Sequence, residues 1–153
     1  MAVTFNELND PVTTVSSLLF ANWDVDDIAG TSVKPNIGDT WDLNKVNLKN
    51  NDVIRCYEVA ASHDFLGVGH GLDKGGARIS IDMATKVSRS RLRDLYSEVV
   101  CIIRGARAGN AGTALHTNYA DIKLVSRTDQ SDKQRRWYRY VLDCEITSYE
   151  AVV

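Results

Sequence analysis

A run of glycines in the middle of the sequence has the composition of a phosphate-binding loop. The run is Gly67-Val-Gly-His-Gly71, and Gly75 and Gly76 follow it shortly afterwards. A phosphate cradle needs a helix N-terminus directly after its glycines, whereas here a strand-like segment follows, and the chain has no GxxxxGK[ST] motif. We therefore expect a glycine-rich connection between strands, where positive φ angles are useful, and no nucleotide cofactor.

The histidines are the next candidates, because imidazole is a common metal ligand. His63 and His70 flank a short apolar segment, with Asp64 and Asp73 nearby, and His116 lies far along the chain. Their spacing matches neither a helical HExxH motif nor a Cys/His zinc pattern. We expect neutral, exposed loop histidines and no metal site.

Carboxylates and cysteines complete the set of groups that could catalyse a reaction. The cluster of Asp24, Asp26 and Asp27 lacks the ligand order of a calcium loop, and we expect solvated or interface charge there. The remaining groups are carboxylates on the polar face of an expected strand and three isolated cysteines, which we expect to be buried: Asp143, Glu145, Glu150, Cys56, Cys101 and Cys144. A nucleophilic Cys56 or Cys101 would need an adjacent base. Since each candidate site fails on spacing or context, we expect that the protein is not an enzyme.

The strongest functional signal is a basic and aromatic stretch, Lys133-Gln-Arg-Arg-Trp-Tyr-Arg-Tyr140. Interleaved cations and aromatic rings can neutralise phosphates and stack bases, which would suit a nucleic-acid-binding module. However, aspartates at 129, 132 and 143 bracket the stretch. We therefore favour a polar hairpin tip followed by a strand whose arginines pair with carboxylates on a neighbouring subunit.

The overall composition is that of an average globular domain. The chain has 153 residues, of which 44% are hydrophobic and 25% charged, and this size fits one domain with one core. A formal net charge of -2 gives no global positive field, so nucleic acid is not the expected partner. No apolar run reaches the length of a membrane span, and we expect a soluble protein that is made in the cytoplasm.

Two helices are predicted by apolar spacing. Asp10-Pro11 is a typical helix start, and apolar residues recur at helical spacing from about 11 to 21. A longer amphipathic helix covers residues 88 to 104 and should end at Gly105. Between the first helix and residue 52 we expect a long extended loop, at about 22–52, that contains Trp23 and Trp41. These tryptophans either contact a partner or cover the domain's own core, and the sequence favours neither alternative.

Strands account for most of the remainder. Residues 53–59, 77–83, 119–125 and 137–149 have strand composition or alternation, and 65–68 is a further candidate. The fold class we predict is α+β, a mostly antiparallel sheet of four to five strands with two helices packed on one face.

The order of these elements resembles the small tail-terminator, or tail-completion, proteins of long-tailed phages and tailed archaeal viruses. The resemblance covers roughly residues 10 to 149 and lies in architecture rather than in a sharp motif. The segments that carry it are Ile54-Arg-Cys-Tyr-Glu-Val59, Phe65-Leu-Gly-Val-Gly69, Arg78-Ile-Ser-Ile-Asp82, Arg89-Ser-Arg-Leu-Arg-Asp-Leu-Tyr96 and Arg136-Trp-Tyr-Arg-Tyr-Val-Leu-Asp143. The long segment at 22–52 departs from that family, because it is larger than the core fold requires.

The resemblance implies a structural virion protein with no catalytic residue. Such proteins form a ring, expected to be a homohexamer, that caps the tail tube and joins it to the neck or head-completion protein. A closed ring needs a heterologous interface, in which one face of each subunit complements a different face of the next. The residues we expect at this or a partner interface are Trp23, Trp41, Arg89, Arg91, Arg93, Arg135, Arg136 and Arg139. Other neck or head–tail connector subunits remain an alternative.

Overall fold

The computed structural model describes residues 10–23, 35–38, 52–65, 72–107 and 121–151. Two helices and a five-stranded sheet lie within these residues, which confirms the α+β fold class. In chain order the elements are α1 (Pro11–Asn22), β1 (Asn36–Gly38), β2 (Val53–Phe65), β3 (Leu72–Thr85), α2 (Arg89–Arg107), β4 (Asp121–Asp129) and β5 (Tyr138–Ala151). Neither described helix is long and apolar enough to cross a membrane.

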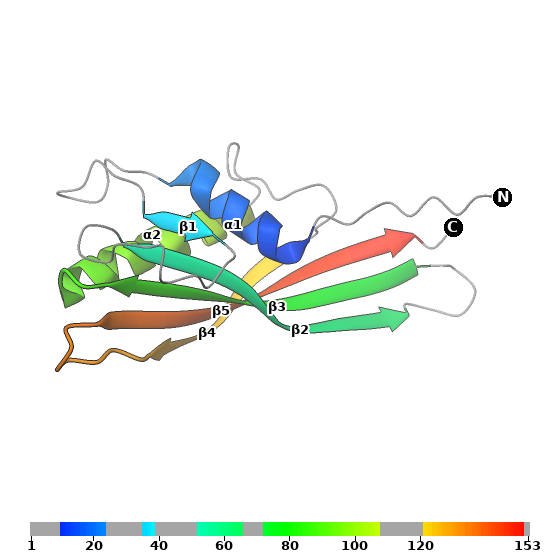
Figure 1. The fold of residues 1–153 in the computed structure, drawn as a ribbon. Helices are drawn as coiled ribbons and strands as arrows, with labels where there is room; N and C mark the ends of the chain where they lie inside the picture. The colour runs from blue at the N-terminus through cyan, green and yellow to red at the C-terminus, as the bar shows by residue number, and fades with distance from the viewer. Residues whose placement is uncertain (1–9, 24–34, 39–51, 66–71, 108–120, 152–153) are drawn as a thin grey trace.

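The sheet is mostly antiparallel, as predicted, and its strand order is β1-β2-β3-β5-β4. Only the pair of β1 and β2, among the described strands, is parallel. The long strands β2, β3 and β5 form the body of the sheet, and both helices lie on one side of it (Figure 1). Neither of the two described helices covers the opposite face of the sheet, which we call the helix-free face.

The segment that we expected to be an extended loop contains a strand. In β1, Ile37 pairs with Ile54 and Gly38 pairs with Arg55 of β2. The backbone N–H of Asn36 also donates to the carbonyl of Asp52 at 2.8 Å. A strand of three residues is too short to show a two-residue alternation, which is why the sequence pattern missed it. The rest of the expected loop, residues 24–34 and 39–51, lies outside the described residues.

The strands also differ in extent from the prediction. Instead of separate strands at 53–59 and 65–68, β2 is continuous from Val53 to Phe65. A register shift against β3 between Glu58 and Ala60 marks a β-bulge. A bulge moves the following side chains to the other face, so it interrupts the alternation from which strands are predicted. The expected boundary at Val59 was therefore a bulge and not a strand end.

The first helix begins as the sequence indicates. The side chain of Asp10 accepts a hydrogen bond from the N–H of Val12 at 3.1 Å, and Pro11 occupies the first turn. Its buried side chains, Val15, Leu18 and Leu19, pack in the core between helix and sheet.

The second helix extends further than predicted. The hydroxyl of Ser88 accepts from the N–H of Arg91 at 3.1 Å, which caps the start. Gly105 does not close the helix, because α2 continues to Arg107. Glycine inside a helix costs about 1 kcal/mol relative to alanine. Burial of Ala106 in the core offsets this cost, since tertiary packing stabilises the last turn.

The core lies between the helices and one face of the sheet. Alternate residues of the central strands face the helices, and in register Ile54 lies beside Met83, and Ile81 beside Leu142. These side chains are almost fully buried, and each contributes roughly 1.5–3 kcal/mol by leaving water. The intervening residues of the same strands point to the helix-free face.

Candidate functional site

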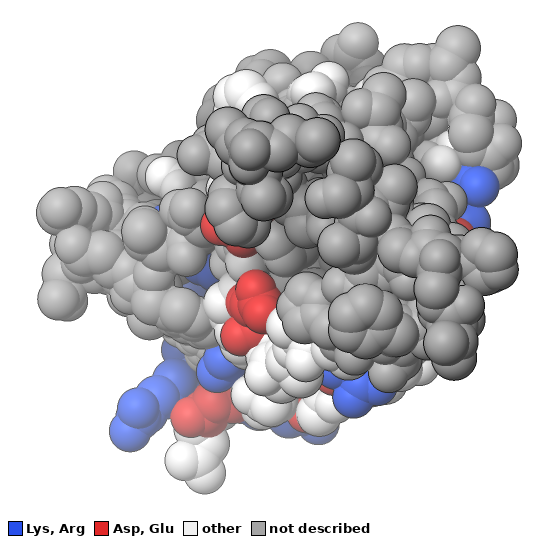
Figure 2. All heavy atoms as spheres, turned by 90° about the vertical axis from the view of Figure 1, so that its right-hand side faces the viewer, with Lys and Arg blue, Asp and Glu red and all other residues white. Residues whose placement is uncertain are grey.

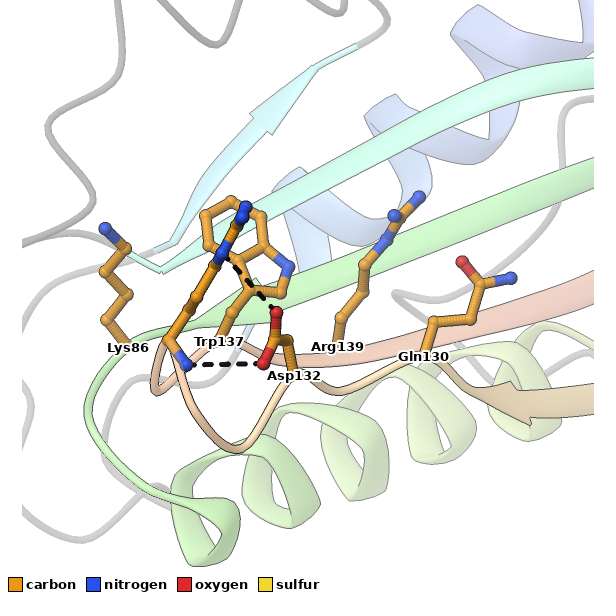
Figure 3. A pocket seen from close by; sticks show the side chains of 6 residues that line it. Lys86, Gln130, Asp132, Trp137 and Arg139 are labelled. Carbon is orange, nitrogen blue, oxygen red and sulfur yellow. Dashed lines mark hydrogen bonds and ion pairs between the residues drawn. The ribbon is translucent and has the colours of Figure 1, made fainter.

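A pocket of about 490 Å³ lies at one end of the helix-free face. Its lining comes from the connection between β3 and α2 and from the hairpin that joins β4 to β5, and consists of Lys86, Gln130, Asp132, Arg135, Trp137 and Arg139. In Figure 3 the labelled side chains rise from these segments on the side away from α2. We call this feature the hairpin pocket.

The hairpin owes its shape to a tight four-residue turn. Asp132 and Trp137 form an antiparallel bridge in which each N–H donates to the other's carbonyl, at 2.7 and 2.9 Å. A carboxylate oxygen of Asp132 accepts from the N–H of Gln134 at 3.1 Å and of Arg135 at 3.3 Å. Aspartate favours turns for this reason, since its side chain satisfies the exposed N–H groups.

Arg136 closes the turn in an unusual backbone conformation. Its φ angle is 51°, and among the described non-glycine residues no other has a positive φ. The left-handed region costs a residue with a Cβ roughly 1–2 kcal/mol. Glycine or asparagine normally occupies such a position. The backbone conformation of Arg136 therefore has a local cost in free energy.

Lys86 and Trp137 form the apolar and cationic side of the pocket. The Lys86 ammonium lies 5.7 Å from the centroid of the Trp137 ring, within the range of a cation–π contact. Within the described part of the chain Lys86 has no carboxylate partner. Its positive charge is therefore attracted by the ring but not neutralised.

Arg139 is held rigidly in the pocket wall. Its Nε donates to Oδ1 of Asp82 at 2.8 Å, and its Nη2 donates to the second carboxylate oxygen. The hydrogen bond to Asp82 raises the pKa of the guanidinium above its already high value, so Arg139 stays charged. Asp82 is buried on β3, and this two-point contact fixes the plane of the guanidinium.

Beyond the pocket, the helix-free face carries polar pairs of both signs. Asp143 accepts from the hydroxyl groups of Ser80 at 2.5 Å and of Ser126 at 3.3 Å. Lys123 lies 3.9 Å from Glu145 in an ion pair across β4 and β5. In the end view of Figure 2, undescribed residues cover most of the surface, and the acidic and basic side chains that show in its lower part lie next to one another. Along β4 and β5 this face can match alternating charges on a partner, whereas several of its residues on β2 and β3, among them Arg55 and Asp82, are buried.

The structure separates the residues we expected at an interface. Arg135, Arg136 and Arg139 lie together at the hairpin, and the side chain of Arg135 is 87% exposed. Arg89 at the start of α2 is near the same hairpin, because its guanidinium contacts Asp129 at 2.8 Å. Of these four arginines, Arg135 and Arg136 are exposed at the tip, whereas Arg139 is held by Asp82 and Arg89 by Asp129.

The other expected interface residues are placed differently. Trp23 is buried in the core, which favours the alternative that it covers the domain's own interior. Arg91 is buried as well and binds Asp52, which is at odds with a role at a surface. Arg93 is exposed on α2, and Trp41 lies outside the described residues.

Lys86 was not predicted for the site, whereas Trp137 was part of the basic and aromatic stretch but not among the residues expected at the interface. Lys86 is far from the basic stretch in sequence, and the pairing of Thr85 with Tyr138 brings the two segments together. Trp137 and Arg139 occupy alternate positions, so they share a face, and this spacing was the only signal that the sequence offered.

Among the described residues no group of three or more His, Cys, Asp or Glu side chains could hold a metal ion. The glycine run at 67–71, His70 and His116 lie outside these residues, and the side chain of His63 is not described either. Comparison with protein-family models and with curated proteins finds no match to the chain.

Proposed function

We propose that this protein is a structural virion subunit, a tail terminator that caps the tail tube and joins it to the head or neck as part of a ring. The observation that carries the proposal is the hairpin between β4 and β5, whose exposed tip holds Arg136 in a strained conformation beside the hairpin pocket. Strain of this kind persists where function requires it. The α+β architecture with helices on one face agrees with what the family resemblance implies.

Ring assembly would use the hairpin as one half of a heterologous contact. Arg135 and Arg136 project from the end of the sheet, and Arg89 borders them. The matching half would lie on a different surface of the next subunit. Each subunit would then contact one neighbour through its hairpin and the other neighbour through that second surface. The polar face of the sheet would meet the tail-tube protein or the neck protein, where interspersed charges set register. The protein would be made in the host cytoplasm and end in the virion.

Native mass spectrometry of the full chain tests the ring. We expect a discrete closed oligomer, a hexamer, and we expect Arg135→Glu with Arg136→Glu to shift it to monomers. Arg104→Glu is the matched control, because Arg104 is exposed near the other end of α2 and its replacement has the same sign of charge change. A strict monomer at high concentration, with no assembly when tail-tube or neck protein is added, contradicts the proposal.

A different neck or head–tail connector subunit would also form a ring. The binding partner distinguishes the two kinds of subunit. A tail terminator binds the tail-tube protein, whereas a connector nearer the head binds the portal or its adaptor. Pull-down with each purified partner separates the two.

A small nucleic-acid-binding module is the second candidate, favoured by the position of Trp137 among three cationic side chains. It predicts salt-sensitive binding of DNA or RNA that Arg135→Ala and Arg136→Ala weaken. Unchanged affinity in these variants, or no binding at low salt, excludes this candidate.

A further inference from the structure

We infer that the hairpin pocket binds an acidic segment of a partner protein, with a carboxylate of the partner bound between Lys86, Trp137 and Arg135. This inference rests on the proposed function in that it names the chemistry of the partner at the same site. The partner is a polypeptide of a different protein, one that carries closely spaced aspartates or glutamates.

The first support is the charge inside the pocket. Three cations line it, namely Lys86, Arg135 and Arg139. Arg139 is paired with Asp82 and Arg135 is 3.7 Å from Asp132, while Lys86 has no carboxylate among the described residues. The pocket therefore contains one positive charge that no described carboxylate balances. One carboxylate of a partner would balance it.

The second support is the way in which the pocket is held ready. The carboxylate of Asp82 orients Arg139, and the Asp132–Trp137 bridge fixes the hairpin. The indole gives a flat apolar wall beside the Lys86 ammonium, which lies 5.7 Å from the ring centroid. Preorganised groups lose little entropy when a ligand binds, so a short segment can bind with useful affinity.

The third support favours a polypeptide over a polynucleotide. A nucleic-acid backbone presents a phosphate at every step and needs a continuous positive track. Here carboxylates interrupt the cations: Asp132 lies within the pocket, and Asp143 and Glu145 lie along the adjoining strand. A peptide can place one or two carboxylates at the cations and neutral residues opposite these aspartates and glutamates.

Fluorescence anisotropy of a labelled peptide tests the inference directly. The probe is a fluorescein-labelled peptide of alternating Asp and Ser residues, compared with the same peptide carrying Asn in place of Asp, and with a labelled oligothymidylate. We expect saturable binding of the Asp peptide alone. Lys86→Met and, separately, Arg135→Gln should each raise its dissociation constant by about 1.5-fold to fivefold, the range of an exposed charge pair.

Lys123→Gln is the matched control, because it removes one exposed lysine from the same face outside the pocket. It should leave the dissociation constant unchanged. The inference is overturned if the Asp peptide does not bind, if the Asn peptide binds equally well, if oligothymidylate binds more tightly, or if Lys123→Gln weakens binding as much as Lys86→Met. Arg135 is largely exposed, so Arg135→Gln remains informative should Lys86→Met fold poorly.

The oligomeric state of the same samples separates this inference from the proposed function. If the protein binds the Asp peptide but never forms a ring, the inference about the ligand stands and the proposed tail-terminator function is wrong. If the protein forms a ring but does not bind the peptide, the proposed function stands and the inference about the ligand is wrong. The two failures are therefore distinct observations.

Discussion

Under the proposed function, Arg136 is the residue at which local stability and assembly oppose each other. Its φ of 51° is accessible to glycine without cost. We predict that Arg136→Gly raises the free energy of unfolding by about 0.5–1 kcal/mol, because relief of the strain exceeds glycine's extra entropy in the unfolded chain. Urea-induced unfolding monitored by circular dichroism measures this change.

Arg135→Gly is the control for that substitution, since Arg135 precedes Arg136 in the same turn without a positive φ. It should be neutral or slightly destabilising. If Arg136→Gly lowers the urea midpoint as much as Arg135→Gly does, the left-handed conformation is not a strain on the fold. If Arg136→Gly stabilises the chain and also weakens assembly, the arginine is retained for its side chain.

The three cysteines should differ sharply in reactivity. Cys101 is exposed on α2, whereas Cys144 is fully buried and desolvation raises the pKa of its thiol to about 12. Below that pH the Cys144 thiol stays protonated and cannot attack an electrophile. We predict that iodoacetamide at neutral pH modifies Cys101 and not Cys144 in the folded protein, as peptide mass spectrometry would show. Rapid modification of Cys144 without denaturant would contradict its burial.

The same raised pKa has a consequence for stability. An unfolded thiol ionises near its ordinary value of 9.0, while the buried Cys144 thiol does not. The folded state therefore loses relative stability as the pH rises above about 9, and none is lost below it. Cys144→Ala would remove this alkaline dependence but would leave a cavity.

At the level of elements, a buried ion pair joins the start of β2 to the start of α2. Asp52 accepts from the hydroxyl of Thr85 at 2.6 Å and from Nε of Arg91 at 2.7 Å. We predict that Asp52→Asn destabilises the fold by about 3–5 kcal/mol, because it leaves the buried Arg91 charge without its counter-ion. Chemical denaturation measures the loss, and Arg93→Ala, an exposed change on the same helix, should cost less than about 0.5 kcal/mol.

A double variant tests whether Asp52→Asn destabilises the fold through loss of the ion pair or through damage to core packing. Nη1 of Arg91 is buried and has no hydrogen-bond partner among the described residues, so the pair is imperfectly satisfied. Asp52→Asn with Arg91→Met should therefore recover much of the stability that Asp52→Asn loses. An additive or larger loss in the double variant would mean that the two side chains stabilise the fold independently.

Capping signals predicted the elements well, and tertiary contacts account for the differences. Asp10 and Pro11 mark the start of α1 because capping is a local interaction. The extension of α2 beyond Gly105 and the continuity of β2 through its bulge depend on packing partners that are remote in sequence. The spacing of apolar residues carries no information about such partners.

At the scale of the molecule, the sequence indicated two faces of the sheet but not which polar residues meet. Alternation along β3 and β5 predicted a helix-covered face and a polar face. It could not predict that Arg91 turns inward, or that Lys86 joins Trp137, because both depend on how α2 leaves the end of β3. The candidate site was therefore only partly predictable: the stretch that contains Arg135, Trp137 and Arg139 was apparent from the sequence, and Lys86 was not.

The strand order has a consequence for the time at which the protein can fold. The last strand, β5, lies inside the sheet and separates β3 from β4. Until its residues have left the ribosome, β3 lacks a neighbour on one side and β4 has no described strand to pair with. Contacts between segments so distant along the chain close slowly. The hairpin pocket also depends on β5, because Arg139 lies on this strand and Trp137 directly precedes it, so the pocket cannot form on a nascent chain before β5 has left the ribosome.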